Sequence, residues 1–166
     1  MVAEANPILH VIAGPNGAGK TTLYENQIRA LTDAEFVNAD RLALEHYGHV
    51  AVSREESEKG QALADERRRA LMADGRSLVT ESTFSHPSKL DLIKTAKSAG
   101  YRVVVYHVNV KDADRAVARV ESRVRQGGHP ARAHLKVCAL KHALRHEPRT
   151  LAKLRDRAYR LDRSMA

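Results

Sequence analysis

Short apolar runs alternate with amphipathic stretches along the first two thirds of the chain. The apolar runs are rich in β-branched residues, which is typical of buried strands; they cover residues 8–13, 36–38, 77–80 and 101–110. Between these runs, apolar residues recur at helical spacing. These stretches cover residues 21–30, the segment from residue 39 onward, residues 54–73 and residues 86–99. Strands that alternate with helices predict a parallel sheet with helices on both faces.

The best-marked helix is expected over Arg54–Ala73. Ser53 and Glu56 have the spacing of a capping box before it, and Asp74-Gly75 is a stop signal after it. The face expected to point inward carries Leu63, Arg67, Ala70 and Leu71. We expect the charged residues of the same helix, including the run at 65–69, to form a solvated face.

The last third of the chain predicts two further helices and one strand. The helices cover residues 112–126 and 131–146, and the short strand covers Ala158–Leu161. The sheet then has about five strands. A chain of 166 residues without repeats or low-complexity linkers is expected to form a single domain, residues 1–166.

A glycine-rich segment directly after the first strand carries the strongest chemical signal. Its order is Gly14-Pro15-Asn16-Gly17-Ala18-Gly19-Lys20-Thr21, followed by Thr22, and it matches the P-loop pattern GxxxxGK[ST] between a strand and a helix. Glycines let backbone N–H groups surround an anion, Lys20 reaches the β- and γ-phosphates, and Thr21 offers its hydroxyl to Mg²⁺. The alternative is a glycine-rich turn that binds nothing, which the flanking strand and helix disfavour.

Polar residues follow the second and third strands. Asp40 comes after the second strand, and Glu81, Ser82 and Thr83 come after the third. Binding groups of open α/β sheets gather at the carboxyl ends of the strands, so these residues are expected beside the P-loop. Glu81 is suited to help hold Mg²⁺ or to bind a substrate hydroxyl. The alternatives are that Asp40 only caps a helix and that 81–83 is an ordinary polar loop.

An arginine stripe marks the helix at 112–126. Arg115, Arg119 and Arg123 are spaced four apart, nearly opposite an apolar stripe of valines. Such a stripe is either a solvated basic face or a lid whose arginines neutralise a transferred phosphoryl group. In the lid interpretation, Arg119 and Arg123 are the best-placed pair.

Composition narrows the class of protein. The net charge is +8, which suits either a nucleic-acid surface or a positive lid over phosphates. Aromatic residues are few and are not interleaved with basic ones, so a stacking platform for single strands is disfavoured. One cysteine, no apolar run long enough for a membrane and no signal-peptide pattern lead us to expect a cytoplasmic protein without membrane partners.

Several segments together resemble the zeta toxins and their relatives, the UDP-N-acetylglucosamine kinases. The matching segments are GPNGAGKTT at 14–22, FVNADRLA at 36–43, LVTESTFSHPSKLDLI at 78–93, ARVESRVRQGGH at 118–129 and, more weakly, RDRAYRLDRS at 155–164. Many families share the P-loop. The Asn-Ala-Asp and Thr-Glu-Ser-Thr-Phe segments in this order are much more specific, and the resemblance covers most of the chain.

The resemblance implies a fold and a reaction. The fold is a P-loop kinase-like α/β sheet with an arginine-bearing helical lid, and the reaction is transfer of phosphate from ATP, with Mg²⁺, to the sugar 3′-hydroxyl of UDP-N-acetylglucosamine. Asp40 matches the catalytic base, Glu81 and Thr83 match the substrate-binding pair, and Arg119, with Arg123, matches the lid arginine. The implied partners are a nucleotide-sugar substrate and a cognate antitoxin that covers the nucleotide site.

Two other functions remain open from the sequence. One is a kinase for another acceptor, such as a nucleotide or a nucleic-acid 5′ end, which the basic last third favours. The other is a nucleotide-binding module without transfer activity, which the presence of Asp40 disfavours. Salt-dependent binding of nucleic acid would favour the kinase for another acceptor over the zeta-toxin-like kinase.

Overall fold

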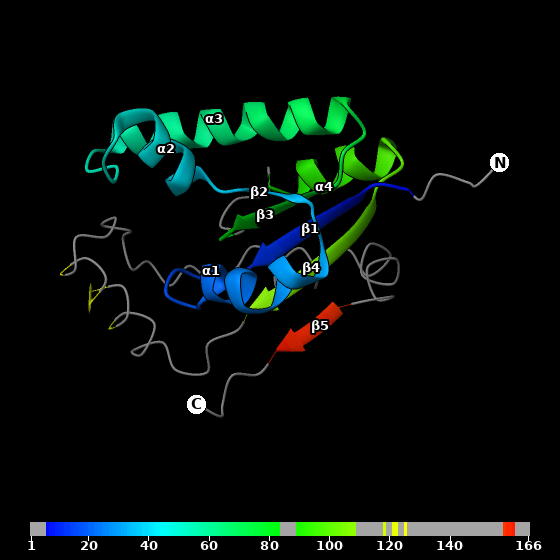
Figure 1. Ribbon diagram of the computed structural model, residues 1–166, viewed down its shortest axis with the longest axis horizontal. Helices are drawn as coiled ribbons and strands as arrows, with labels where there is room; N and C mark the ends of the chain where they lie inside the picture. Colours follow the sequence, from blue (N-terminus) through cyan, green and yellow to red (C-terminus); the bar gives the residue numbers. More distant parts are fainter. Residues whose placement is uncertain are drawn as a thin grey trace.

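The computed structural model is built on a parallel sheet of five strands in the order β2-β3-β1-β4-β5 (Figure 1). The strands are β1 (Ile8–Ala13), β2 (Glu35–Val37), β3 (Leu78–Ser82), β4 (Arg102–Val108) and β5 (Ala158–Leu161). The structure describes residues 6–83, 89–108, 118, 121–122 and 125, and the backbone of 158–161. Among these residues, no helix is long and apolar enough to cross a membrane.

The register brings the carboxyl ends of the central strands together. Ala13, the last residue of β1, lies opposite Ser82 of β3 and His107 of β4. On the outer side of β3, Val37 of β2 lies opposite Thr80. The segments that leave β1, β2 and β3 therefore start at one edge of the sheet, as expected for a parallel α/β fold.

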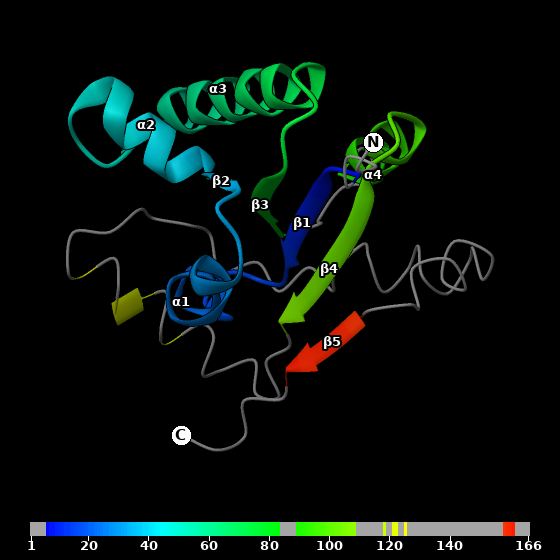
Figure 2. The same ribbon diagram turned by 45° about the vertical axis from the view of Figure 1, so that its right-hand side comes forward.

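Helices cover both faces of the sheet, and side chains alternate between them. Leu9 and Val11 of β1 pack in a core with α3 (Arg54–Ala73) and α4 (Lys89–Ser98), whereas Ile12 packs in a second core with the segment after the P-loop. Figure 2 shows α2 (Ala39–Tyr47), α3 and α4 on one side of the sheet and α1 (Lys20–Leu23) on the other. This layering confirms the predicted α/β class.

The predicted elements agree closely with the structure. Helix α3 has the predicted bounds, and the capping box forms, with the Ser53 hydroxyl accepting from the Glu56 amide at 3.1 Å. β1 has the predicted bounds. β2, β3 and β4 each begin one residue away from the predicted start, and β3 runs on through Glu81 to Ser82 rather than ending at Thr80. The short strand predicted at Ala158–Leu161 is present as β5, parallel to β4.

The helix predicted over residues 21–30 is not a regular α-helix. Four α-helical residues are followed by a π-helical turn, Tyr24–Ile28, and a 3₁₀ turn, Arg29–Leu31. Leu23 and Ile28 are buried as predicted. Tyr24 in the π-helical turn stacks on Phe36 of β2, with ring centroids 3.8 Å apart. We attribute the departure to this packing, because tertiary contacts override local propensity.

The inward face of α3 was predicted only in part, because Leu71 is buried as expected but other members of that face are not. The buried residues are Gly60, Ala64, Arg68 and Leu71. Arg67 and Ala70, expected inside, are exposed, and Leu63 is half-buried. Small residues at 60 and 64 let α2 approach α3 closely, and Arg68 is buried because an acidic and a hydroxyl partner compensate its charge. The expected solvated face at 65–69 is therefore interrupted.

Candidate active site

The P-loop joins the end of β1 to the start of α1. Gly17 and Gly19 have φ values of 76° and 87°, a conformation that favours glycine because it has no Cβ. The Ala18 amide donates to the Pro15 carbonyl at 3.2 Å and closes the turn. The buried Lys20 donates its Nζ to the same carbonyl at 3.1 Å, so its ammonium group lies over the loop. The loop thus has the conformation that its sequence pattern requires.

Thr21 and Glu81 meet across the carboxyl edge of the sheet. The Thr21 hydroxyl donates to a Glu81 carboxylate oxygen at 3.1 Å. Burial raises the pKa of Glu81, and the charge of Asp40 raises it further. The Lys20 ammonium, the Thr21 hydroxyl and the Asn38 side chain act in the opposite direction. Glu81 is therefore within electrostatic reach of both the P-loop and Asp40.

Asp40 stands in the first turn of α2, and Asn38 fixes where that turn begins. The Asn38 side-chain oxygen accepts a hydrogen bond from the Arg41 amide at 2.9 Å, and so caps the helix. Asn38 is itself buried, whereas the Asp40 side chain is exposed. The capping role considered for Asp40 therefore belongs to Asn38, and the carboxylate of Asp40 is available to a ligand.

A cleft of about 1500 Å³ brings most of the predicted site residues together. Its walls come from the P-loop, the start of α2, the carboxyl end of β3, α3 and α4. The predicted residues that line it are Asn16, Gly17, Gly19, Lys20, Thr21, Thr22, Asp40, Glu81 and Thr83. Gly14, Pro15 and Ala18 belong to the same loop but are not among the residues that line the cleft. Arg119 and Arg123 lie outside the described residues, as does most of the predicted lid helix at 112–126; residues 118, 121–122 and 125 of that helix are described and are helical.

Asn38 and Arg68 are among the residues of the cleft that were not predicted as part of the site. Asn38 directly precedes the helix that carries Asp40, and an asparagine before an amphipathic stretch is a capping signal that would have found it. Arg68 lines the cleft from α3. It stands in a run of charged residues, so nothing in the pattern sets it apart from its exposed neighbours.

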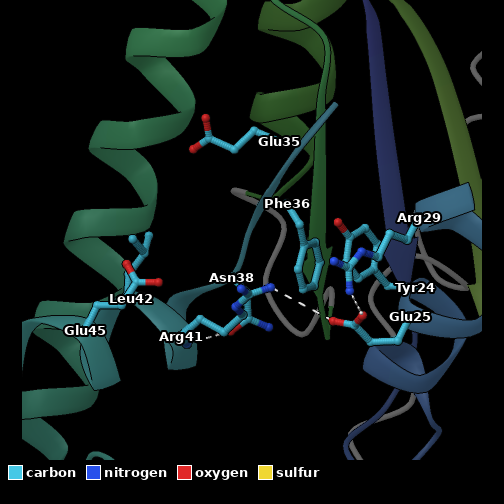
Figure 3. Close-up of a pocket in the computed structure, with 9 residues that line it drawn as sticks. All are labelled: Tyr24, Glu25, Arg29, Glu35, Phe36, Asn38, Arg41, Leu42 and Glu45. Atoms are coloured by element: carbon cyan, nitrogen blue, oxygen red, sulfur yellow. Dashed lines mark hydrogen bonds and ion pairs between the residues drawn. The ribbon is translucent and has the colours of Figure 1, made fainter. Parts of the chain in front are cut away.

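A smaller cavity, of about 320 Å³, is also lined by Asn38 (Figure 3). Its lining is Tyr24, Glu25, Arg29, Glu35, Phe36, Asn38, Arg41, Leu42 and Glu45. The Phe36 ring lies between Tyr24 and the guanidinium of Arg41, which is 5.8 Å from the ring centroid. Glu25 pairs with Arg29 at 3.0 Å and with Arg41 at 4.0 Å. These contacts pack β2 between α2 and the π-helical and 3₁₀ turns at Tyr24–Leu31.

The donor atoms beside Lys20 fit a magnesium ion bound together with nucleotide phosphates. Thr21 Oγ1 and the Glu81 carboxylate are hard oxygen donors 3.1 Å apart, in a cleft that reaches the P-loop. Mg²⁺ is usually held by one or two such protein oxygens together with substrate phosphates and water. Thr21 and Glu81 are thus the residues that would hold the ion, directly or through water.

A parallel α/β sheet, with a P-loop after its central strand and a cleft at its carboxyl edge, defines a P-loop NTPase with a kinase-like fold. Comparison of the sequence with known families agrees. Residues 9–148 match the family described as AAA domain (AAA_33), and the chain belongs to that family. No curated protein matches the sequence significantly.

Solved structures share this fold. A kinase candidate from Chloroflexus aurantiacus is 21% identical, with a TM-score of 0.62 over 82% of this chain and 78% of that one. A chain from the PezAT toxin–antitoxin system of Streptococcus pneumoniae is 18% identical, with a TM-score of 0.64 over 93% and 68%. A chain of the Pnkp1/Rnl/Hen1 RNA repair complex is 18% identical, with a TM-score of 0.62 over 93% and 47%. At these identities the likeness is one of fold.

Proposed function

We propose that this chain is a zeta-toxin-like kinase that transfers the γ-phosphate of ATP to the sugar 3′-hydroxyl of UDP-N-acetylglucosamine. One observation carries the proposal: Lys20, Thr21, Asp40, Glu81 and Thr83 line the same cleft. The sequence segments that hold them are also the ones that resemble the zeta toxins and their relatives. A phosphate-binding loop and an exposed carboxylate therefore line one cleft.

The residues would divide the work of transfer as follows. Lys20 neutralises negative charge on the β- and γ-phosphates. This charge is redistributed over the phosphate oxygens as the phosphoryl group is transferred. Asp40 accepts the proton of the attacking hydroxyl, and that hydroxyl oxygen then bonds to phosphorus while ADP leaves. Glu81 and Thr83 hold the acceptor beside the donor, which lowers the entropic part of the barrier. Magnesium held near Thr21 would supply charge neutralisation at the phosphates.

The lid is part of the proposal. Arg119 and Arg123 would approach the phosphates from the helix predicted at 112–126 and stabilise the transferred group. The support is the four-residue spacing of the arginines and the resemblance of residues 118–129 to the zeta toxins. Replacing Arg119 by lysine keeps the charge but removes the planar fork, so it separates these two contributions.

A cognate antitoxin is the proposed protein partner. The fold likeness to a chain of a toxin–antitoxin system supports this assignment, together with the resemblance in sequence. We expect the antitoxin to cover the nucleotide cleft and compete with ATP. Inhibition of transfer that is relieved by excess ATP would support this, and inhibition independent of ATP concentration would place the partner elsewhere.

A kinase for a nucleic-acid end or a free nucleotide is the second candidate. The net charge of +8 favours an anionic polymer, and the fold likeness to a chain of an RNA repair complex points the same way. This candidate predicts oligonucleotide binding that weakens steeply with salt. The zeta-toxin-like candidate predicts no such dependence for its acceptor beyond that of one small anion.

Transfer from γ-labelled ATP to a panel of acceptors tests the proposal. The panel holds UDP-N-acetylglucosamine, other nucleotide sugars, nucleosides and 5′-hydroxyl oligonucleotides, each with and without Mg²⁺. We expect label on UDP-N-acetylglucosamine, and phosphorus NMR of the product should place the phosphate on the sugar 3′-oxygen. Label only on an oligonucleotide or nucleoside would replace this acceptor by the second candidate. ATP binding without label on any acceptor would leave a binding module.

A further inference from the structure

Arg68 is a buried charged residue in the middle of α3. Its side chain is only 8% exposed, although the arginines on either side of it, Arg67 and Arg69, are exposed. Its guanidinium donates to the Thr80 hydroxyl at 3.1 Å through Nη1 and pairs with Asp65 through Nη2. The same side chain lines the cleft that holds Lys20.

The Thr80 hydroxyl passes this contact on to a second strand. Thr80 Oγ1 accepts from Arg68 and donates to the Val37 carbonyl oxygen at 3.3 Å. A hydroxyl has one proton, so the donation from Arg68 leaves that proton directed at Val37. Arg68 thereby links α3 to β3 and β2 at the point where Val37 lies opposite Thr80.

Each end of this link is one residue away from the proposed active site. Val37 precedes Asn38, which caps α2 and so sets the position of Asp40. Thr80 precedes Glu81, which receives the Thr21 hydroxyl. A shift of either strand end would therefore move a carboxylate of the cleft relative to the P-loop.

The fold itself does not require an arginine here. Burying a guanidinium costs desolvation, and a well-packed apolar residue at such a site is often equally stable or more stable. The neighbours of Arg68 on the buried face, Ala64 and Leu71, are of that apolar kind. The guanidinium supplies a hydrogen bond to Thr80 of β3 while Asp65 on its own helix holds its other side, which an apolar side chain cannot do.

We propose that Arg68 is a positioning residue for phosphoryl transfer, acting through Thr80 to hold Asn38, Asp40 and Glu81 in register with the P-loop. The proposal rests on the proposed kinase function. It is distinct from binding the acceptor directly, because positioning affects the rate of the bound complex and direct binding affects the acceptor's KM.

The Arg68→Met variant separates these roles, with Lys59→Met, at an exposed position on the same helix, as the control. We expect Arg68→Met to lower kcat about 10- to 100-fold, since small misplacements of reacting groups are costly, while the acceptor KM and the ATP affinity change less than about twofold. Lys59→Met should keep the wild-type kcat. A second variant, Arg68→Lys, keeps the charge but loses the fork, and should show the same loss if Arg68→Met does not fold.

Thr80→Val tests the path of the effect. We expect it to lower kcat, and the double variant with Arg68→Met should be no slower than the slower single variant, because both changes break one link. Losses that multiply would overturn the proposal. So would a wild-type kcat in Arg68→Met, or a raised acceptor KM with kcat unchanged, which would make Arg68 a substrate contact.

Hydrogen exchange tests the link without any acceptor. The Arg41 amide donates to Asn38 and reports whether the start of α2 is held. In Arg68→Met we expect this amide to exchange at least about tenfold faster, and in Lys59→Met at the wild-type rate. If the wild-type protein transfers phosphate to no acceptor, the proposed function fails, and an unchanged exchange rate in Arg68→Met would overturn the positioning role separately.

Discussion

At the scale of single residues, the proposed site is a set of polar groups whose surroundings fit the roles proposed for them. Lys20 is buried against the loop that precedes it, so its ammonium has a fixed place before any phosphate arrives. Glu81 sits between the Thr21 hydroxyl and the charge of Asp40. Asp40 is exposed at the start of a capped helix. These surroundings suit Lys20 to bind phosphate, Glu81 to offer oxygen donors to a metal ion or a hydroxyl, and Asp40 to act as a base.

Replacing Lys20 by methionine tests the phosphate ligand. Methionine keeps most of the length of the buried side chain, so folding should persist, while loss of a charged hydrogen bond to phosphate should weaken ATP binding about 10- to 100-fold. Calorimetric titration with ATP measures this. The control is Lys59→Met, at an exposed position on α3, which should bind ATP normally. Unchanged affinity in Lys20→Met would contradict the assigned role.

Site residues that belong to a recognisable short sequence pattern can be predicted from the sequence. Site residues whose role depends on how distant segments pack together are missed. The P-loop is a contiguous pattern, so Lys20 and Thr21 can be found without any structure. Asp40 and Glu81 follow from the rule that parallel strands present their carboxyl ends at one edge. Arg68 has the same sequence surroundings as Arg67 and Arg69, and only the register of α3 on the sheet decides which of the three is buried.

At the scale of elements, the close approach of α2 to α3 positions the helix that carries Asp40. A Cβ added at Gly60 would lie 2.7 Å from the Ala39 carbonyl oxygen and 2.9 Å from the Ala43 Cβ. Glycine at this position therefore sets the distance between the two helices. The hydrophobic pattern of α3 does not show this requirement, because a glycine marks neither the buried face nor the exposed face of a helix.

Gly60→Ala should destabilise the protein. The added methyl meets backbone on the facing helix, and overpacking of this kind costs about 1–3 kcal/mol, of which better helix propensity offsets up to about 1 kcal/mol. Denaturant unfolding measures the difference, with Lys59→Ala on the exposed face of the same helix as the control. Stability equal to or above that of the wild type would show that α2 can move away without cost.

An ion pair ties α3 to the edge strand and gives a pH-dependent prediction. Arg67 donates through Nε and Nη2 to the two oxygens of Glu35, each at 2.6 Å, and Figure 3 shows Glu35 directed toward α3. The hydrogen bonds from Arg67 lower the pKa of Glu35 below its ordinary value, despite partial burial. Because the pKa of Glu35 is lowered in the folded state, the ion pair adds to the free energy of unfolding at pH values above the ordinary pKa of 4.5. This stabilisation is lost as the pH falls through the pKa of Glu35 in the folded state.

Glu35→Gln should therefore reduce the free energy of unfolding at pH 7 by about 0.5–1 kcal/mol, a small loss because both side chains are partly exposed. At about pH 3 the wild-type advantage should shrink, because below the ordinary pKa of 4.5 the unfolded state takes up a proton that the ion pair in the folded state resists. Unfolding curves of both proteins at the two pH values measure this. A difference that stays constant with pH would exclude the ion pair as its source.

At the scale of the whole molecule, the alternation of strands and helices gave the fold class and the number of strands correctly. The strand order and the exact bounds needed the structure, because they depend on pairing between distant segments. The irregular segment after the P-loop also depends on such packing, through Tyr24 and Phe36. The cleft is a property of the assembled sheet and of three helices that surround its carboxyl edge.

In the proposed function, Asp40 is the base for phosphate transfer in this cleft. We would compare wild-type protein and Asp40→Asn for ATP affinity and for transfer from γ-labelled ATP to UDP-N-acetylglucosamine in the presence of Mg²⁺. We expect equal ATP affinity and a rate of transfer that is about 10²- to 10⁴-fold lower in Asp40→Asn. Transfer at the wild-type rate in Asp40→Asn would remove Asp40 from the proposed mechanism.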